Sequence, residues 1–263
     1  MSQRKMTALV TGASGGIGEE LARLFAADGH GLVLVARSRD KLARLAEELQ
    51  GRHGVAARVL AADLARPDAP REIFDELQGA GVAIDALVNN AGFGSYGLFA
   101  ETDPEFELDL LRVNVVALTH LTKLFLPGML ARRRGYVMNV ASTAAFQPGP
   151  LMAVYYASKA YVLSFSEALT NECAGTGVRV SALCPGPTET GFVEAAGMGD
   201  SKLFDRAVMD ARTVAVEGYR GLLAGKAVVI PGLRNNLLAR SIGFFPRNLV
   251  TKVVRGIQEK RNS

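Results

Sequence analysis

Short apolar runs rich in β-branched residues alternate with longer amphipathic stretches, and this alternation constrains the fold more than any other feature of the chain. Strand-like runs lie at residues 7–10, 32–35, 57–60, 86–88, 136–140, 178–183 and 227–230, and helical patterns lie at 16–28, 39–50, 67–78, from 103 onward and at 152–172. Strands that alternate with helices pair in parallel and are covered on both faces. The sequence therefore predicts an α/β fold with a doubly wound parallel sheet of about seven strands.

The bulk composition favours one soluble globular domain. Hydrophobic residues make up 49% of the 263 residues and charged residues 21%, which is ordinary for a chain with one large core. No low-complexity linker, internal repeat or composition break divides the sequence. We expect a single domain over residues 1–263, with a substrate lid at 188–212 and a helical C-terminal extension at 233–263.

Cysteine usage and the N-terminus favour a cytoplasmic protein. Cys173 and Cys184 lack the paired spacing of a metal site, so we expect reduced, packed thiols and no bound metal. The N-terminal residues lead directly into a strand, and no apolar stretch long enough to span a bilayer is expected. The net charge of +4 arises near the C-terminus and gives no support for nucleic-acid binding by the whole domain.

A glycine-rich turn follows the first predicted strand. The residues from Thr11 to Gly18 read Thr-Gly-Ala-Ser-Gly-Gly-Ile-Gly and open the first predicted helix. Glycines here permit a tight turn and let backbone N–H groups approach a pyrophosphate at the helix N-terminus. A purely structural turn is the alternative, and the place of the motif between strand and helix favours dinucleotide binding.

The end of the second predicted strand indicates which dinucleotide is bound. An acidic residue there typically binds the ribose 2′-hydroxyl of NAD, whereas an arginine accommodates the 2′-phosphate of NADP. This strand ends in Val-Ala-Arg37 with no carboxylate, and the Arg37 guanidinium offers a planar set of donors suited to phosphate. We therefore predict NADP(H), with a solvated surface role for Arg37 as the alternative.

Four polar residues are candidates for the chemistry. Tyr155 and Lys159 are four residues apart in a helical pattern and share one face, so the lysine cation is expected to lower the tyrosine pKa from its usual value of about 10. Ser142, directly after a predicted strand, is expected to bind the substrate oxygen, with a turn or cap role as the alternative. Asn114 is a poor helix former in an apolar helical stretch. It is either a satisfied core amide or a polar kink that holds water beside Lys159.

Taken together, these motifs resemble the short-chain dehydrogenase/reductase family of Rossmann-type oxidoreductases over about residues 5–232. The resemblance is carried by the turn at residues 11–18, Asn-Asn-Ala-Gly at 89–92, Asn114, Ser142, Tyr155 with Lys159, and Pro185-Gly186 with Thr190. It implies a catalytic tetrad of Asn114, Ser142, Tyr155 and Lys159, hydride transfer between nicotinamide and a carbonyl carbon, and the strand order 3-2-1-4-5-6-7. It also implies a homodimer or homotetramer.

The predicted cofactor site follows from the same resemblance and from the strand ends. Asp63 is expected to accept from the adenine amino group, with a helix cap as the alternative. Many NADP-using relatives carry a basic residue in the glycine-rich turn; this chain does not, so the preference rests on Arg37, with Arg39 as a further candidate. The predicted cofactor-binding residues are Gly12, Ser14, Gly15, Gly16, Ile17, Gly18, Arg37, Asp63, Leu64, Asn90, Ala91, Gly92, Tyr155, Lys159, Pro185, Gly186, Thr188 and Thr190.

Apolar residues near the expected cleft favour a lipophilic substrate. They are Phe93, Phe146 and Met152, with Phe192, Met198, Leu203 and Phe204 in the expected lid. The C-terminal extension mixes apolar residues with Arg234, Arg240, Arg247, Lys252, Arg255, Lys260 and Arg261, and Pro246 divides it into two expected helices. A packed extension, a subunit interface, and a docking surface for an anionic membrane or an acidic acyl carrier remain open.

Three functions remain open at this point. The first is NADPH-dependent interconversion of a carbonyl and a secondary alcohol on a free lipophilic small molecule. The second is reduction of a 3-oxoacyl group bound to coenzyme A or acyl carrier protein, which the basic extension keeps open. The third is a non-catalytic NADP-binding regulator. The intact Asn, Ser, Tyr and Lys set favours an NADP-dependent enzyme, and the first function is our prediction.

Overall fold

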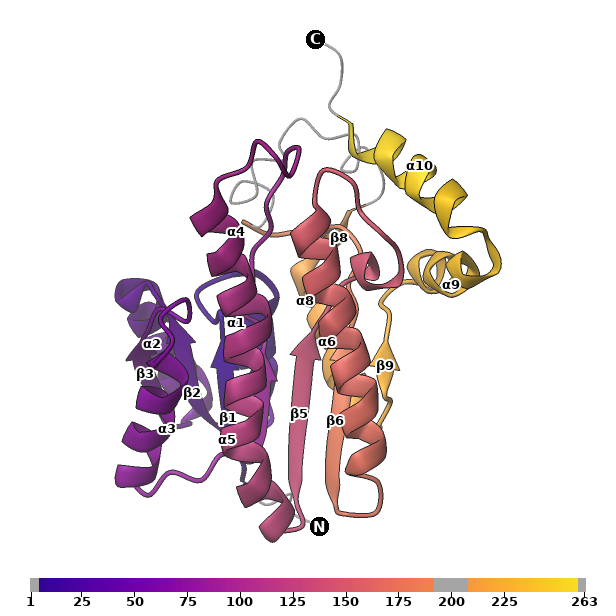
Figure 1. Cartoon of the computed structure of the whole chain (residues 1–263). Helices are drawn as coiled ribbons and strands as arrows, with labels where there is room; N and C mark the ends of the chain where they lie inside the picture. Colours follow the sequence, from indigo (N-terminus) through magenta and orange to yellow (C-terminus); the bar gives the residue numbers. More distant parts are fainter. Residues whose placement is uncertain (1–4, 192–207, 260–263) are drawn as a thin grey trace.

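A computed structural model describes residues 5–191 and 208–259, and its centre is a seven-stranded parallel sheet (Figure 1). The order across the sheet is β3-β2-β1-β4-β5-β6-β9, so the predicted order 3-2-1-4-5-6-7 is confirmed. The strands are β1 (Thr7–Thr11), β2 (Gly31–Ala36), β3 (Ala57–Ala61), β4 (Ala86–Asn89), β5 (Gly135–Val140), β6 (Val178–Leu183) and β9 (Val228–Val229).

Helices cover both faces of this sheet, as the alternating sequence pattern predicts. The main ones are α1 (Gly16–Ala27), α2 (Arg39–His53), α3 (Ala69–Gly79), α4 (Pro104–Leu111), α5 (Leu118–Ala131), α6 (Ala153–Glu172) and α8 (Ala211–Leu223). In β1, Ala8 and Val10 join the apolar core formed with α1, α2 and α8, whereas Leu9 joins the core formed with α3, α5 and α6. Successive side chains of a strand point to opposite faces, so a strand buried on both faces needs a continuous apolar run.

Buried polar side chains join the central strands to the helices behind them. The Asn89 amide at the end of β4 donates to Asn139 Oδ1 of β5 at 2.9 Å, and the Asn139 amide donates to Ser166 Oγ of α6 at 2.9 Å. At the opposite end of β4, buried Asp85 accepts from Thr7 N and pairs with Arg134 at 2.8 Å. Each of these bonds satisfies a polar group in a place where its loss would leave an unpaired group out of water.

The predicted helix from residue 103 contains a π-helical segment. Asp103 caps α4 by accepting from Phe106 N, and the π-helix η1 (Arg112–Ala117) separates α4 from α5. By length and composition alone, the run from 104 to 131 could cross a membrane. The expectation that no stretch reaches this length is therefore wrong. Here the run is a core helix, because Leu121 and Phe125 pack against the sheet.

The C-terminal extension consists of α9 (Leu233–Ser241), a short 3₁₀ turn (Ile242–Phe244) and α10 (Arg247–Gln258). Pro246 immediately precedes α10, so the predicted division at this proline is confirmed. The extension lies beside the N-terminal end of α6, at the end of the sheet to which the strands point (Figure 1). Within its described part, Ala239, Val254 and Gln258 are buried while most of its large apolar side chains are exposed.

The expected lid at 188–212 lies partly outside the described residues. Its two ends form β7 (Thr188–Glu189) and β8 (Met209–Asp210), which pair in parallel. Two-residue strands carry too little pattern to be predicted from sequence. Phe192, Met198, Leu203 and Phe204 lie outside the described residues, so their assignment to a lid stays a prediction.

Candidate active site

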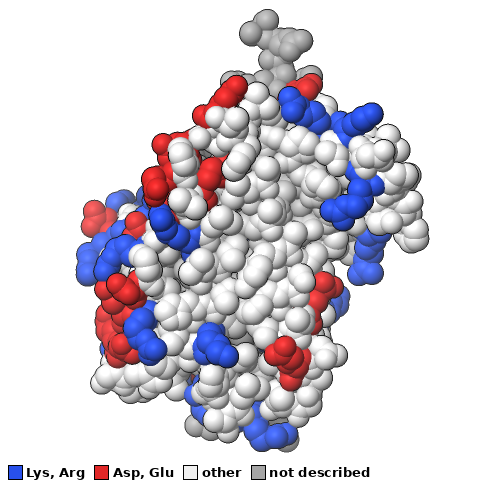
Figure 2. Space-filling view, viewed as in Figure 1, with Lys and Arg blue, Asp and Glu red and all other residues white. Residues whose placement is uncertain are grey.

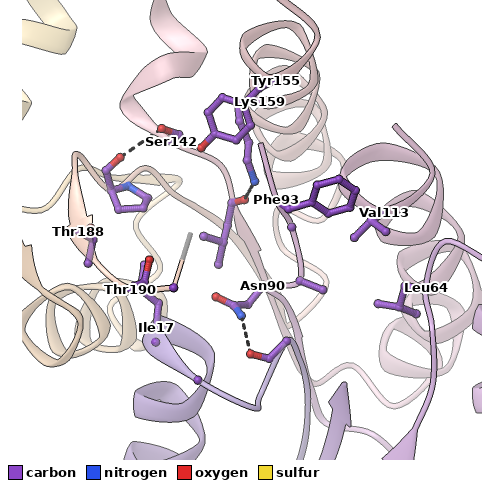
Figure 3. Close-up of a pocket in the computed structure, with 18 of the residues that line it drawn as sticks. Ile17, Leu64, Asn90, Phe93, Val113, Ser142, Tyr155, Lys159, Thr188 and Thr190 are labelled. Carbon is purple, nitrogen blue, oxygen red and sulfur yellow. Dashed lines mark hydrogen bonds between the residues drawn. The ribbon is translucent and has the colours of Figure 1, made fainter. Parts of the chain in front are cut away.

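A cleft of about 890 Å³ lies at the carboxyl ends of the strands, where the strand order reverses between β1 and β4 (Figure 3). Ligands of open α/β sheets bind at this type of switch point. The cleft is lined by most of the predicted site residues: Gly12, Ser14, Gly15, Gly16, Ile17, Arg37, Asp63, Leu64, Asn90, Ala91, Gly92, Ser142, Tyr155, Lys159, Pro185, Gly186, Thr188 and Thr190. Gly18 and Asn114 do not line the cleft; they contact residues that do, Asn90 and Phe93.

The glycine-rich turn is held against the end of β4 by Asn90. The Asn90 amide donates to the carbonyl oxygens of Thr11 at 3.0 Å and Gly12 at 3.2 Å. A Cβ on Gly18 would lie 2.4 Å from the Asn90 amide nitrogen, so the contact requires a glycine at this position. Gly12 and Gly16 also have positive φ angles of 65° and 57°, a conformation that side chains disfavour. The turn therefore forms a cradle of backbone that fits the pyrophosphate of a dinucleotide.

The rim of the cleft beside β2 carries two basic residues. Arg37, at the end of β2, lines the cleft as predicted, and so does Lys41 in the first turn of α2. Arg39 is absent from the lining, so its suggested part in phosphate binding is not supported. Lys41 was not predicted from the sequence. The spacing that places it one helical turn beyond Arg37 was available as a signal.

Asp63 lines the cleft just beyond β3. Its Oδ1 accepts from Ala65 N at 3.0 Å, which fixes the turn that follows the strand. The turn role and a cofactor role are compatible, because a carboxylate accepts several hydrogen bonds.

Tyr155 and Ser142 face each other across the reacting end of the cleft (Figure 3). Burial raises the pKa of Tyr155 above its ordinary value, and the hydrogen bond with Ser142 acts in the opposite direction. The expected lowering by Lys159 is therefore wrong for the chain alone, because desolvation of the phenolate outweighs the effect of its neighbours. At neutral pH the phenol keeps its proton, which suits a proton donor.

Ser142 also stabilises the local backbone. Its hydroxyl accepts from Ala144 N at 3.1 Å and caps a 3₁₀ turn (Thr143–Phe146). The same hydroxyl lies 3.4 Å from Pro185 O and reaches Tyr155. The cap alternative is therefore confirmed, whereas the catalytic role of Ser142 stays a prediction.

Lys159 is buried beneath the cleft, and its ammonium donates to Val140 O at 2.9 Å. Desolvation lowers its pKa from 10.5 to about 8. A Cβ on Gly92 would lie 3.3 Å from the Lys159 nitrogen and 2.9 Å from Asn114 Oδ1, so a glycine is required where the lysine and Asn114 approach this loop.

Asn114 lies inside the π-helical segment and is almost wholly buried. Its amide donates to Phe93 O at 3.0 Å and to Ser158 Oγ at 3.1 Å, while Phe93 N donates to its Oδ1 at 3.2 Å. The side chain is satisfied, so the core-amide alternative applies, and a polar kink that holds water beside Lys159 stays a prediction. π-bulges occur frequently at functional sites, where they re-aim a side chain.

The substrate side of the cleft is largely apolar. Phe93, Phe106, Val113, Met152 and Tyr156 line it. Phe146 was expected here and is not among the lining residues, because its side chain packs instead against the core between α6 and α9. Phe106 and Val113 were not predicted, although they are seven residues apart and share one face of a helix.

The end of α10 supports this side of the cleft. The side-chain amide of Gln258 donates to the hydroxyl of Tyr156. The backbone carbonyl of Gln258 accepts from the hydroxyl of Tyr96 at 2.7 Å. Tyr156 lies edge to face against Tyr155, with 6.0 Å between ring centroids. The C-terminal helix is therefore connected to Tyr155 through one aromatic neighbour, Tyr156.

Known proteins resemble this chain in sequence and in fold. A family model described as short chain dehydrogenase matches residues 6–200. A very-long-chain 3-oxoacyl-CoA reductase of Phaeosphaeria nodorum is 38% identical over 66% of this chain and 52% of the relative. The 17-beta-hydroxysteroid dehydrogenase type 3 of Mus musculus is 33% identical over 85% of this chain and 74% of the relative. The chain spans about half the length of the first of these relatives.

The fold comparison extends over nearly the whole chain. A solved short-chain dehydrogenase from Sphingobium yanoikuyae in complex with NADPH superposes with a TM-score of 0.82 at 34% identity. The match covers 91% of this chain and 94% of that protein. Its architecture is therefore shared almost from end to end.

Replacing Gly18 with alanine tests the cradle. The new Cβ would collide with the Asn90 amide and with Gly12 O, both at 2.4 Å, so Gly18→Ala should lower the melting temperature and weaken NADPH binding by about tenfold or more. Gly51→Ala, in α2 and outside the cleft lining, is the matched control, because nothing lies within 4 Å of its Cβ. Calorimetric titration and thermal unfolding measure both effects. Equal behaviour of the two variants would contradict the cradle.

The lowered pKa of Lys159 predicts how stability changes with pH. Between about pH 8 and 10.5 the unfolded chain binds the Lys159 proton more tightly than the folded chain does. The free-energy cost of burying the cation therefore destabilises the fold fully below pH 8 and disappears as pH rises. Relative to that of Lys159→Met, the free energy of unfolding of the wild type should rise by about 2–4 kcal/mol over this interval. Urea unfolding of both proteins from pH 7 to 10 measures the difference. Parallel curves would rule out a depressed pKa.

Proposed function

Because this chain belongs to the short-chain dehydrogenase family, we propose that it is an NADPH-dependent oxidoreductase that interconverts a ketone and a secondary alcohol on a bulky lipophilic molecule. The observation that carries the proposal is the meeting of Ser142, Tyr155 and Lys159 at one end of a cleft whose other end is a glycine cradle rimmed by Arg37. NADPH, when bound, supplies the hydride; the residues of the chain bind, orient and move the proton.

Tyr155 supplies the proton to the substrate oxygen in the direction of reduction. Its burial keeps the phenol protonated, so the proton is present when the carbonyl oxygen gains negative charge. The Ser142 hydroxyl, held by its contact with Ala144 N, is placed to donate to the same oxygen. Both donors are fixed before the substrate arrives, which reduces the reorganisation that the reaction needs.

Lys159 and Asn114 support this pair from below. The buried ammonium favours negative charge on Tyr155 after the proton has left, and its partner Val140 O keeps it in place. Asn114 links the loop at Phe93 to Ser158 of α6, so it fixes the helix that carries both Tyr155 and Lys159. A proton path to solvent beside Lys159 remains part of the proposal.

The apolar lining supports a large lipophilic substrate. Phe93, Phe106 and Met152 would bury hydrocarbon, at about 25 cal/mol per Å² of apolar surface removed from water. The mouse relative, which covers most of this chain, is named as a hydroxysteroid dehydrogenase, and this name is consistent with a bulky, rigid ketone.

A second candidate is the reduction of a 3-oxoacyl-CoA. It is favoured by the names of the first curated relatives and by the basic residues of the C-terminal extension, which suit the phosphates of coenzyme A. A homo-oligomer and a cytoplasmic location are further parts of the proposal. The regulatory alternative is disfavoured, since a regulator has no need of an assembled Ser142 and Tyr155 pair.

Tyr155→Phe tests the chemistry and names the substrate class. With NADPH and a panel of steroid ketones, aryl ketones and long-chain 3-oxoacyl-CoA thioesters, the variant should lose about a hundredfold or more in kcat, because the proton donor is removed. Binding of NADPH should stay within twofold. Tyr161→Phe, an exposed tyrosine on the same helix, is the control and should keep its rate. NADPH binding without any turnover by the wild type would favour the regulator.

The basic rim predicts the cofactor preference. Arg37→Ala should lower the ratio of kcat/KM for NADPH to that for NADH by about tenfold to a hundredfold, the value of a charge-assisted hydrogen bond to phosphate. Lys41→Ala should act in the same direction with a smaller effect. Arg39→Ala should leave the ratio unchanged, since Arg39 does not line the cleft. A ratio that depends on Arg39 and not on Arg37 would overturn the assignment.

A further inference from the structure

The C-terminal extension exposes large apolar side chains that pack against nothing in the described chain. Leu233 is 93% exposed, Phe244 88% and Leu237 72%. Phe245, Leu249 and Val253 are each about half exposed. A contiguous apolar surface of this kind on a soluble domain typically marks an interaction site.

The two faces of α10 are used differently. Val250, Val254 and Gln258 follow one another at intervals of four residues and face inward, with Val254 and Gln258 buried. Leu249 and Val253 are also four residues apart, and both are exposed on another face. The helix is thus held to the domain by one stripe while a second apolar stripe faces outward.

Basic residues flank the outward stripe. Arg234, Arg240, Arg247 and Lys252 are exposed, and within the described ranges none of them lies within ion-pair distance of a carboxylate. Arg255 pairs with Glu259 at 3.4 Å. Figure 2 shows Lys and Arg separated by uncharged surface over α9 and α10, whereas acidic residues gather on the opposite side over α4. On this face, the described part of the extension therefore carries unpaired cations while acidic side chains lie over α4.

We propose that α9, the turn Ile242–Phe244 and α10 form a docking surface for an anionic lipid bilayer. Protruding Phe and Leu side chains beside Arg and Lys are the composition of helices that lie in the membrane interface, with apolar residues in the acyl boundary and cations at the headgroups. Each cation near an anionic surface strengthens the attraction to it. A soluble acidic partner would satisfy the charges but would leave Leu233 and Phe244 without an apolar environment.

The helix α10 contributes its outer face to the docking surface and packs its inner face beside the substrate side of the cleft. Val254 packs in the same apolar cluster as Met152, Tyr155 and Tyr156, and Gln258 bonds to Tyr156. A bilayer bound to the outer face would lie beside the region from which a lipophilic ketone enters. This consequence rests on the proposed function; binding itself does not.

Vesicle flotation of the full-length chain tests the proposal. Wild type should bind vesicles of phosphatidylcholine with phosphatidylglycerol, bind phosphatidylcholine alone at least tenfold more weakly, and be released by high salt. The double variants Leu237→Glu with Phe244→Glu, and Arg240→Glu with Arg247→Glu, should each lose tenfold or more in affinity. Phe99→Glu and Arg52→Glu, exposed residues outside the extension, are matched controls and should bind like the wild type.

Further readouts separate the alternatives. All variants should keep the wild-type melting temperature and the wild-type rate on a water-soluble ketone, so lost binding reports the surface and not the fold. Failure of the wild type to bind anionic vesicles, or equal binding by every variant, overturns the proposal. So does a dimer in light scattering that Leu237→Glu with Phe244→Glu dissociates, because a second copy then covers this face. Vesicle binding without turnover of any ketone would leave docking standing and remove the proposed function.

Discussion

The bond network of the Asn90 side chain is the constraint on which the cofactor end of the site depends. Its amide joins the ends of β1 and β4, the two strands between which the sheet reverses its winding, and it does so at the glycine turn. Gly18 must lack a side chain for this contact to exist. The cradle is therefore made by tertiary contact between two strand ends, and neither segment could hold the turn alone. Thr190, whose methyl group would touch a Cβ on Gly16, completes the enclosure from the other half of the sheet.

The reacting end depends on burial and on hydrogen bonds that hold charged or polar groups in place. Lys159 is kept beneath the cleft by Val140 O although desolvation opposes its charge. Asn114 reaches both the loop at Phe93 and α6, so the π-helical segment is a means of bringing one amide to two elements. Such features reduce stability locally and fix geometry where the chemistry needs it.

Local patterns predicted much of this arrangement. The parallel sheet, the glycine turn and the Tyr155 and Lys159 pair followed from short patterns placed by regular elements, whereas the strand order followed from the family resemblance. What failed depended on three-dimensional surroundings. The pKa of Tyr155 rises because burial, which spacing does not report, outweighs the hydrogen bond with Ser142. Phe146 turns into the core because the 3₁₀ turn after Ser142 directs it away.

The C-terminal extension likewise shows that a sequence pattern predicts helices but not their surroundings. Its amphipathic pattern predicted two helices, but the pattern could not say which apolar residues would be covered. In α10 the answer comes from Gln258, a polar residue that is buried because Tyr156 and Tyr96 supply its partners. Once that end is fixed, Val254 must face the domain and Leu249 and Val253 must face outward, because the helical repeat leaves no other arrangement. The exposed apolar stripe is thus a consequence of how the helix is attached beside the substrate cleft, and any partner that covers it is brought next to the same wall.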